Sequence, residues 1–194
     1  MRKAACFGWL LCLVLATARA GLAQGFQISV GGDDCGALPG PPFCLGGTYT
    51  DTGTTVGTNN TVGMVNAGCL PQTAVSGVDV IYSIQSVTAF STPDFDIRVT
   101  PAPGYDVAIY LVGPGAATCP AGPNATTANC VAGANAGGPG VTEIISHSAL
   151  VGLSLGQYFL FIDSTAVGAA SSGSYTLSVG PGVCPVELME YSID

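Results

Sequence analysis

Five aspartates occupy positions from which their carboxylates could bind a cation. Asp79 and Asp106 each follow a glycine and one bulky residue at the start of an apolar run, and Asp163 closes another such run. Asp33 and Asp34 form an adjacent pair. Calcium binds roughly six to eight oxygen ligands, and carboxylates and backbone carbonyls occur together where a strand leaves a glycine turn. The pattern therefore predicts a calcium site, with the alternative that each carboxylate accepts backbone N–H bonds within its own turn.

Two further acids, Asp94 and Asp96, could form a pair for acid–base hydrolysis. They are two residues apart on a predicted strand, so their side chains share one face, near Arg98. Glycoside hydrolysis needs two carboxyl groups on either side of a cleft, with their pKa values pushed apart. The sequence shows no sign of such a cleft and favours a solvated turn and strand edge here.

The single histidine, His147, is flanked by Ser146 and Ser148. A serine hydrolase brings a nucleophile, a base and an orienting acid together in space, whereas neighbours on a strand point to opposite faces. One histidine is too few for a typical zinc hydrolase. The sequence therefore predicts that this protein is not an enzyme.

Tyrosines are the candidates for binding a glycan, because exposed aromatic rings stack on sugars and carry a polar tip. Tyr105 and Tyr110 are the first choices, and Tyr49 and Tyr191 are also available. Tyr110 shares a strand face with Asp106, which would expose it. The alternative is that Tyr110 covers the outer side of the core.

The first 23 residues have the pattern of a secretory signal peptide. Arg2 and Lys3 precede an apolar run, and small residues allow cleavage after Ala20 or Ala23. Cleavage leaves Arg98 as the only lysine or arginine against twelve acids, a net charge of about −11. Such a chain is a poor partner for nucleic acid or an anionic membrane surface. We expect an exported protein without membrane insertion after cleavage.

Six cysteines remain after cleavage, an even number that predicts three disulfides in an oxidising compartment. The absence of a CxxC pair argues against zinc. Cys119 and Cys130 bracket a polar loop and are predicted to pair with each other. The other four cysteines allow three pairings, between which the sequence does not choose: Cys35, Cys44, Cys69 and Cys184.

Strand patterns recur along the chain, separated by turns rich in glycine and proline. Apolar side chains alternate with polar ones in most of them, whereas residues 156–164 are apolar on both faces. These features predict an all-β antiparallel β-sandwich of one domain, residues 24–180, followed by a tail or extra strand at 181–194. The predicted strands cover residues 78–84, 95–100, 105–112, 156–164 and 173–180, with weaker candidates at 25–30, 61–65 and 142–146.

The order of the segments GVDVIYSI, GYDVAIYLV, LSLGQYFLFIDS and GSYTLSVG resembles the bacterial pre-peptidase C-terminal (PPC) domain family. That family has an Asp-led strand, a DLYLY-like strand and a closing GxYxLxV strand. Residues 77–180 carry the resemblance, while 30–76 match only loosely. The chain departs from the family in its six cysteines and in the lack of a neighbouring catalytic domain.

The resemblance implies a compact jelly-roll-like sandwich that serves as an accessory module, and some relatives bind calcium. We therefore expect a secreted, non-catalytic module that binds an unknown surface protein or a glycan, in the medium or at the cell surface, and that calcium stabilises. A carbohydrate-binding module is the first alternative. An acidic secreted hydrolase that uses carboxylates is the second.

Overall fold

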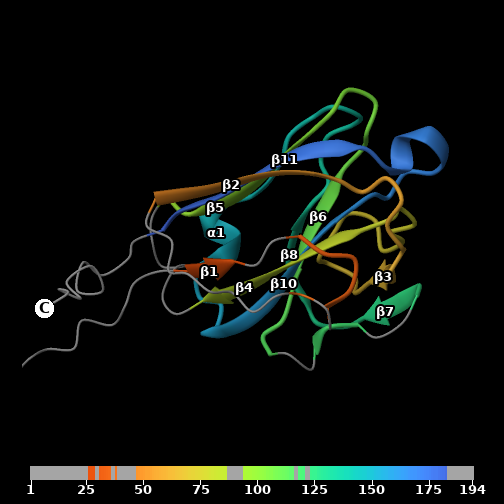
Figure 1. The fold of residues 1–194 in the computed structure, drawn as a ribbon. Helices are drawn as coiled ribbons and strands as arrows, with labels where there is room; N and C mark the ends of the chain where they lie inside the picture. Colours follow the sequence, from red (N-terminus) through yellow and green to blue (C-terminus); the bar gives the residue numbers. More distant parts are fainter. Residues whose placement is uncertain are drawn as a thin grey trace, which may run out of the picture.

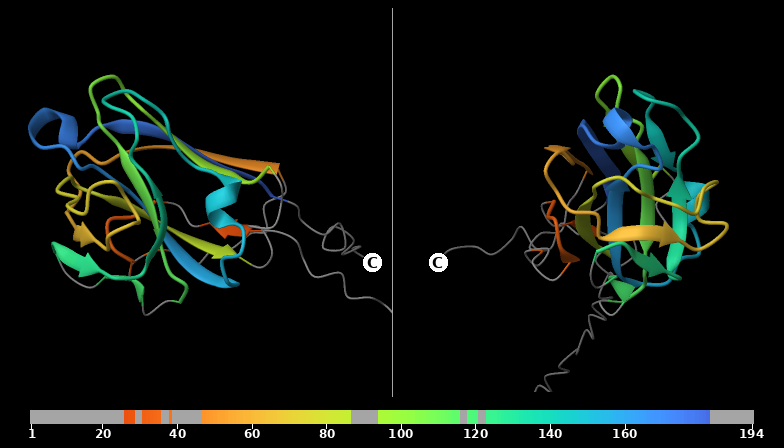
Figure 2. Two further views of the ribbon diagram at one scale, coloured as in Figure 1. Left: turned by 180° about the vertical axis from the view of Figure 1, so that it is seen from behind. Right: turned by 90° about the vertical axis from the view of Figure 1, so that its right-hand side faces the viewer.

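The structure is a computed structural model, and it describes residues 26–28, 31–35, 38, 47–86, 94–115, 118–120 and 123–182. These residues form two antiparallel β-sheets that pack face to face, with a smaller layer on the outer side of one sheet (Figure 1). The predicted all-β sandwich of one domain is confirmed. Figure 2 shows the same layers from behind and from the side.

The first sheet has five strands in the order β1-β4-β10-β6-β8. Strand β10 lies in its middle and pairs antiparallel with β4 on one side and β6 on the other. The bounds are β1 Phe26–Ile28, β4 Val80–Ser86, β6 Ala108–Val112, β8 Cys130–Ala134 and β10 Gly156–Asp163.

The second sheet has four strands in the order β2-β11-β5-β9. Successive strands of the chain cross between the two sheets, and this order, with β4-β10-β6-β8 opposite, is that of a jelly roll. The bounds are β2 Gly47–Thr54, β5 Asp96–Pro101, β9 Glu143–Ile145 and β11 Ser174–Gly182. The main body also contains the short helix α1 His147–Leu150 and the 3-10 helix η4 Gly168–Ser171.

The main core lies between the two sheets and follows the predicted alternation. Residues of β4, β6, β5 and β11 that were assigned to one face are buried there together. Because side chains alternate between the two faces of a strand, the sequence pattern identifies this core directly. Its members include Val80, Tyr82, Ile84, Ile97, Val99, Ile109, Leu111, Leu177 and Val179.

A second apolar core covers the outer face of the first sheet. Side chains from β4, β6 and β10 meet residues of the parallel strands β3 (Val62–Val65) and β7 (Ala125–Thr127) and of the loops beside them. The central strands are therefore buried on both faces, which is why residues 158–162 of β10 form an unbroken apolar run. Its members include Val62, Val65, Leu70, Ile81, Tyr110, Phe159 and Phe161.

Disulfides tie this outer layer down, and the predicted Cys119–Cys130 pair is wrong. The structure pairs Cys35 with Cys119 and Cys69 with Cys130, with Cα atoms 6.2 Å and 5.8 Å apart. The prediction counted only the short separation along the chain. In the fold, Cys130 opens β8 while Cys69 lies on the loop that covers the same sheet. Cys44 and Cys184 lie outside the described residues.

All eight predicted strands occur in the structure, with shifted ends, and β11 continues past residue 180 to Gly182. Strands β2, β7 and β8 were not predicted. The proposed signal peptide and most of the proposed tail lie outside the described residues. Within the described part of the chain, no helix is long and apolar enough to cross a membrane.

Candidate functional site

The aspartates at the strand ends gather at one end of the sandwich. Strands β4 and β6 both run antiparallel to β10, and Val80 pairs with Ile162 while Ala108 pairs with Asp163. Asp79, just before β4, and Asp106, just before β6, therefore lie at the end of the sheet where Asp163 closes β10. The sequence predicted each position but not their meeting at one end, because only the pairing of distant strands decides it.

Asp79 is buried and anchors the loop that leads into β3. Its Oδ2 accepts hydrogen bonds from the backbone N–H groups of Thr61 at 2.8 Å and Val62 at 3.1 Å. Its Oδ1 is buried without a hydrogen-bond partner. The pKa of Asp79 is raised to about 6, mainly by desolvation and to a smaller degree by the nearby Asp33 carboxylate, while the two N–H groups act to lower it.

Asp163 is also fully buried, and donors occupy both of its oxygens. Oδ1 accepts from the backbone N–H of Ser164 at 2.6 Å, and Oδ2 accepts from the hydroxyl of Tyr110 at 2.8 Å. Burial raises the pKa of Asp163 well above its usual value, and the like charge of Asp79 adds to this. These contacts make Asp163 and Asp79 framework groups that hold strand ends and the outer layer together.

Asp106 is half-buried and contributes mainly through its backbone. Its N–H donates to the carbonyl of Ala170 at 3.0 Å, and its carbonyl accepts from the Ser164 hydroxyl at 2.6 Å. Its Oδ1 is buried without a hydrogen-bond partner. Asp106 thus links β6 to the segment around η4.

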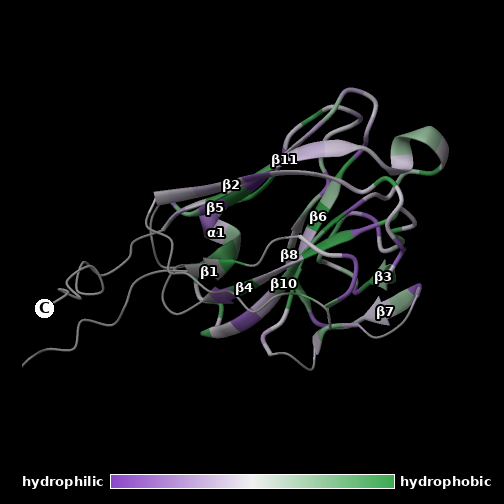
Figure 3. Ribbon diagram, in the orientation of Figure 1, coloured by the Kyte–Doolittle hydropathy of each residue, from purple (hydrophilic) through white to green (hydrophobic). Residues whose placement is uncertain are grey.

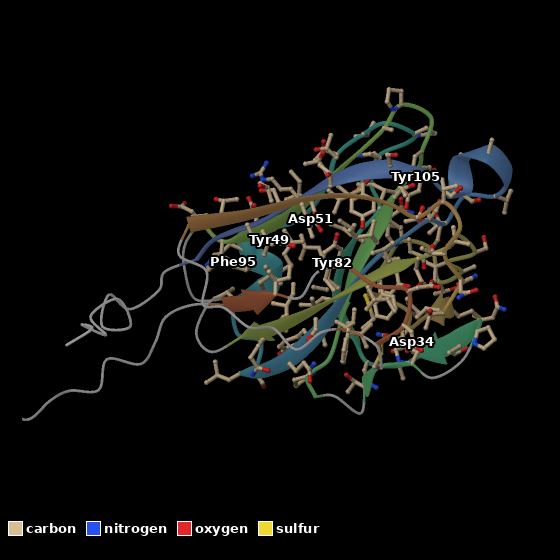
Figure 4. All side chains as sticks on the ribbon, viewed as in Figure 1. Asp34, Tyr49, Asp51, Tyr82, Phe95 and Tyr105 are labelled. Carbon is tan, nitrogen blue, oxygen red and sulfur yellow. A yellow bond between two sulfur atoms is a disulfide. The ribbon has the colours of Figure 1, made fainter. Side chains whose placement is uncertain are left out.

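Asp33 and Asp34 border a separate hollow of about 400 Å³, which we call the Asp33 hollow. The two carboxylate oxygens of Asp33 accept from the backbone N–H and the side-chain amide of Asn59, both at 2.6 Å. Asn60 also borders this hollow, and its Oδ1 is buried without a hydrogen-bond partner. Figure 4 shows Asp34 near β7, well away from the middle of the sandwich.

The five aspartates do not form one compact metal centre. In the part of the chain that the structure describes, no group of three or more His, Cys, Asp or Glu side chains is placed to hold a metal ion. Calcium can also use amide, hydroxyl and backbone oxygens, and such oxygens border the Asp33 hollow. The calcium site therefore stays a prediction, with this hollow as its best location.

The glycan platform predicted at Tyr105 and Tyr110 is wrong, because both rings are buried. Tyr110 stacks on Phe161 in the second core, with ring centroids 5.1 Å apart. The Tyr105 hydroxyl donates to the backbone carbonyl of Asp163 at 2.9 Å. Tyr105 lies in the main core between the sheets. The strand face that carries Tyr110 was expected to meet solvent, but it meets the outer layer.

The two weaker catalytic candidates, the Asp94/Asp96 pair and His147 with its flanking serines, are not arranged for catalysis. Asp96 forms an ion pair with Arg98 on the outer face of β5, and Asp94 is exposed. The hydroxyls of Ser146 and Ser148 bond to each other at 2.9 Å. The Nδ1 of His147 has no hydrogen-bond partner and therefore does not bond to either serine.

A polar cluster that the sequence did not reveal lies at the open edge of the sandwich, between β2 and β4. The Tyr82 hydroxyl donates to Asp51 Oδ2 at 2.9 Å and lies 3.0 Å from the Tyr175 hydroxyl. Burial raises the pKa of Tyr82 far above its usual value and that of Tyr175 to about 12. Figure 4 shows Asp51 and Tyr82 between the two sheets, with Tyr49 beside them.

This cluster forms the floor of a hollow of about 320 Å³, which we call the mouth hollow. One wall is Gly31, Gly32 and Asp33, and the other is the β2 segment 51–54. The sequence signal that could have revealed this hollow is the carboxylate of Asp51, which lies on the inward face of an edge strand. The sequence hid it because Asp51 and Gly53 break the apolar alternation by which strands are found.

A wider, shallow hollow of about 600 Å³ lies on the outer face of the second sheet, and we call it the face hollow. Threonine and serine side chains of β2, β5 and β11 border it.

No family model, curated protein or solved structure matches the chain. The fold therefore defines an all-β jelly-roll sandwich, and the resemblance to the PPC family stays a prediction from the sequence.

Proposed function

We propose that this protein is a secreted, non-catalytic binding module of the PPC type, acting at the cell surface or in the medium. The observation that carries the proposal is a difference between the buried polar groups, which hold the fold together, and the polar groups that border the surface hollows. The buried carboxylates of Asp79, Asp163 and Glu143 are used to hold backbone N–H groups. The hollows on either side of β2 are bordered mainly by hydroxyl groups and backbone.

Two features, the disulfides and the N-terminal sequence, support the proposal of an exported protein. The disulfides Cys35–Cys119 and Cys69–Cys130 suit an oxidising compartment. The sequence from Met1 to Ala23 has the pattern of a secretory signal peptide. In the proposed function, the disulfide-tied outer layer keeps the sandwich rigid while the face of the second sheet is free for a partner.

An assay for turnover tests the non-catalytic part of this proposal. We expect the purified protein to hydrolyse none of a panel of chromogenic glycosides, esters and peptides above the buffer rate. The acidic hydrolase alternative predicts turnover that depends on carboxylates. Turnover that disappears in Asp96→Asn, or in Asp51→Asn, while the protein stays folded would overturn the proposal.

The proposal includes a calcium ion that stabilises the Asp33 hollow. Two adjacent carboxylates and the Asn60 Oδ1 supply the oxygen ligands that calcium prefers. At a calcium concentration 100 times the dissociation constant, binding to the folded state alone adds about 2.7 kcal/mol to the free energy of unfolding. We expect the melting temperature to rise with millimolar calcium and to fall back with chelator.

The matched control for calcium is a pair of single substitutions. Asp34→Asn, at the hollow, should reduce the calcium-dependent rise, whereas Asp94→Asn, at an exposed position elsewhere, should leave it unchanged. A melting temperature that is the same with calcium and with chelator would remove calcium from the proposal. The binding role would stand without it.

A further inference from the structure

The two hollows on either side of strand β2 meet at Gly53. The mouth hollow opens between the sheets and the face hollow lies on the outer side of the second sheet, yet Thr52, Gly53, Thr54 and Tyr175 border both. Since β2 is the edge strand of its sheet, a groove can pass around it at this point. We propose that a neutral polysaccharide chain binds along this path, which we call the β2 track. The inference rests on the proposed binding function and names its ligand class.

Glycines make room for the two phenol groups at the floor of the mouth hollow. A Cβ atom on Gly31 would lie 2.9 Å from Cζ of Tyr82, too close for any side chain without movement. A Cβ atom on Gly53 would collide with the hydroxyl of Tyr175. The hydroxyl ends of Tyr82 and Tyr175 therefore occupy space that is free only because these two residues are glycines. Both tyrosines border the hollow at its floor.

The chemistry of the mouth hollow fits the hydroxyl groups of a sugar. Asp51 is only partly buried, and it accepts from the Tyr82 hydroxyl and from the N–H of Thr52. A carboxylate has about four lone-pair positions, so further acceptor capacity remains for ligand O–H groups. The volume of about 320 Å³ lies in the range of small-ligand sites.

The face hollow continues the path with a regular array of hydroxyls. The register places Thr176 of β11 opposite Thr52 of β2 and opposite Thr100 of β5, and the Thr100 and Thr142 hydroxyls lie 2.9 Å apart. A row of threonines thus crosses the sheet at the strand spacing of about 4.8 Å, and the next row follows about 6.8 Å along the strands. Figure 3 shows β2 in pale and purple tones, whereas green segments lie in β4 and β10.

Charge favours a neutral chain over other polymers. Asp33 and Asp51 border the mouth hollow, and Arg98, the only lysine or arginine after position 19, is paired with Asp96. A sulfated or uronic-acid polysaccharide would be repelled, because like charges raise the free energy of the complex. Hydroxyls both donate and accept hydrogen bonds, which matches a polyhydroxylated ligand at each step of the track.

The test measures retention on neutral polysaccharides. The purified protein is incubated with cellulose, chitin, xylan and starch granules, and with an array of neutral and anionic oligosaccharides. We expect binding to at least one neutral polymer and none to the anionic ones. Asp51→Asn should weaken that binding about tenfold, because a hydrogen bond to a charged group is worth roughly one factor of ten or more.

Matched lysine substitutions locate the site. Thr176→Lys puts a long side chain in the middle of the track and should abolish retention. Thr126 is also an exposed threonine, on β7 in the outer layer, and Thr126→Lys should bind as the wild type does. Unchanged melting temperatures would show that both variants are folded.

The possible results separate this inference from the proposed function. Equal binding of a neutral glycan by the wild type and Thr176→Lys, or loss in both lysine variants, would overturn the track but not the binding function. Retention of a basic peptide or an envelope protein, with no glycan bound, would overturn the glycan inference and leave the module a protein binder. Turnover of any glycan would overturn both.

Discussion

Removing the Cys69–Cys130 disulfide should lower the free energy of unfolding by about 4 kcal/mol, the largest single effect we expect. The bridge closes a loop across a sequence separation of 61 residues, and the entropy that this removes from the unfolded chain accounts for about that amount. Both cysteines are also buried in the second core. Urea unfolding of the Cys69→Ala/Cys130→Ala double variant measures the loss.

The second bridge provides the control. Cys35→Ala/Cys119→Ala removes a disulfide with a sequence separation of 84, so the loss of chain entropy is similar. Its cysteines only border the second core, and we therefore expect the Cys69–Cys130 variant to lose more. Peptide mapping without reductant should find the two bridges, and a peptide that links Cys119 to Cys130 would contradict the structure.

The second large effect is a fall in stability as pH rises through about 6. The pKa of Asp79 is about 6 in the folded protein and 3.8 in the unfolded chain, so the folded state binds the proton more tightly. The stabilisation from this proton is complete below about pH 4 and is lost as pH passes the folded value. The difference corresponds to about 3 kcal/mol. The raised pKa of Asp163 acts in the same direction.

Asp79→Asn isolates this effect. The amide oxygen can still accept the N–H groups of Thr61 and Val62, while the titrating charge is gone. With chelator present, the difference in unfolding free energy between about pH 3 and about pH 7.5 should change by about 3 kcal/mol relative to the wild type. The exposed Asp94→Asn should not change it. The same pH dependence in the wild type and in Asp79→Asn would contradict the buried position of this carboxylate.

The sequence predicted strands reliably where apolar residues alternate. Tyr175, Leu177 and Val179 show the pattern in its simplest form, and they lie in the core as expected. Strand β2 escaped prediction because its inward residues are Tyr49, Asp51 and Gly53. These residues suit the inside of the sandwich only because Tyr82 binds Asp51 and Tyr175 needs the space at Gly53.

The candidate site was harder to predict than the fold. The pairing of Cys119 and the exposure of Tyr105 and Tyr110 were each inferred from nearby sequence. Residues far along the chain decided all of them. Cys35 pairs with Cys119, Tyr105 lies in the core between the two sheets, and residues 62–75 and 125–130 cover the face of β6 that carries Tyr110. Alternation of residue types along a strand therefore does not distinguish a face that meets solvent from a face that a second core covers.

The sequence by itself determined the fold class, the positions of the predicted strands and the core-facing side of most of them, because these depend on the two-residue period of side chains along a strand. Only the tertiary structure decided which cysteines pair, which aspartates are buried together and where the surface is hollow. Those properties depend on which strands lie side by side. The jelly-roll order places β2 at an open edge and brings three strand-end carboxylates to one end of the sheet.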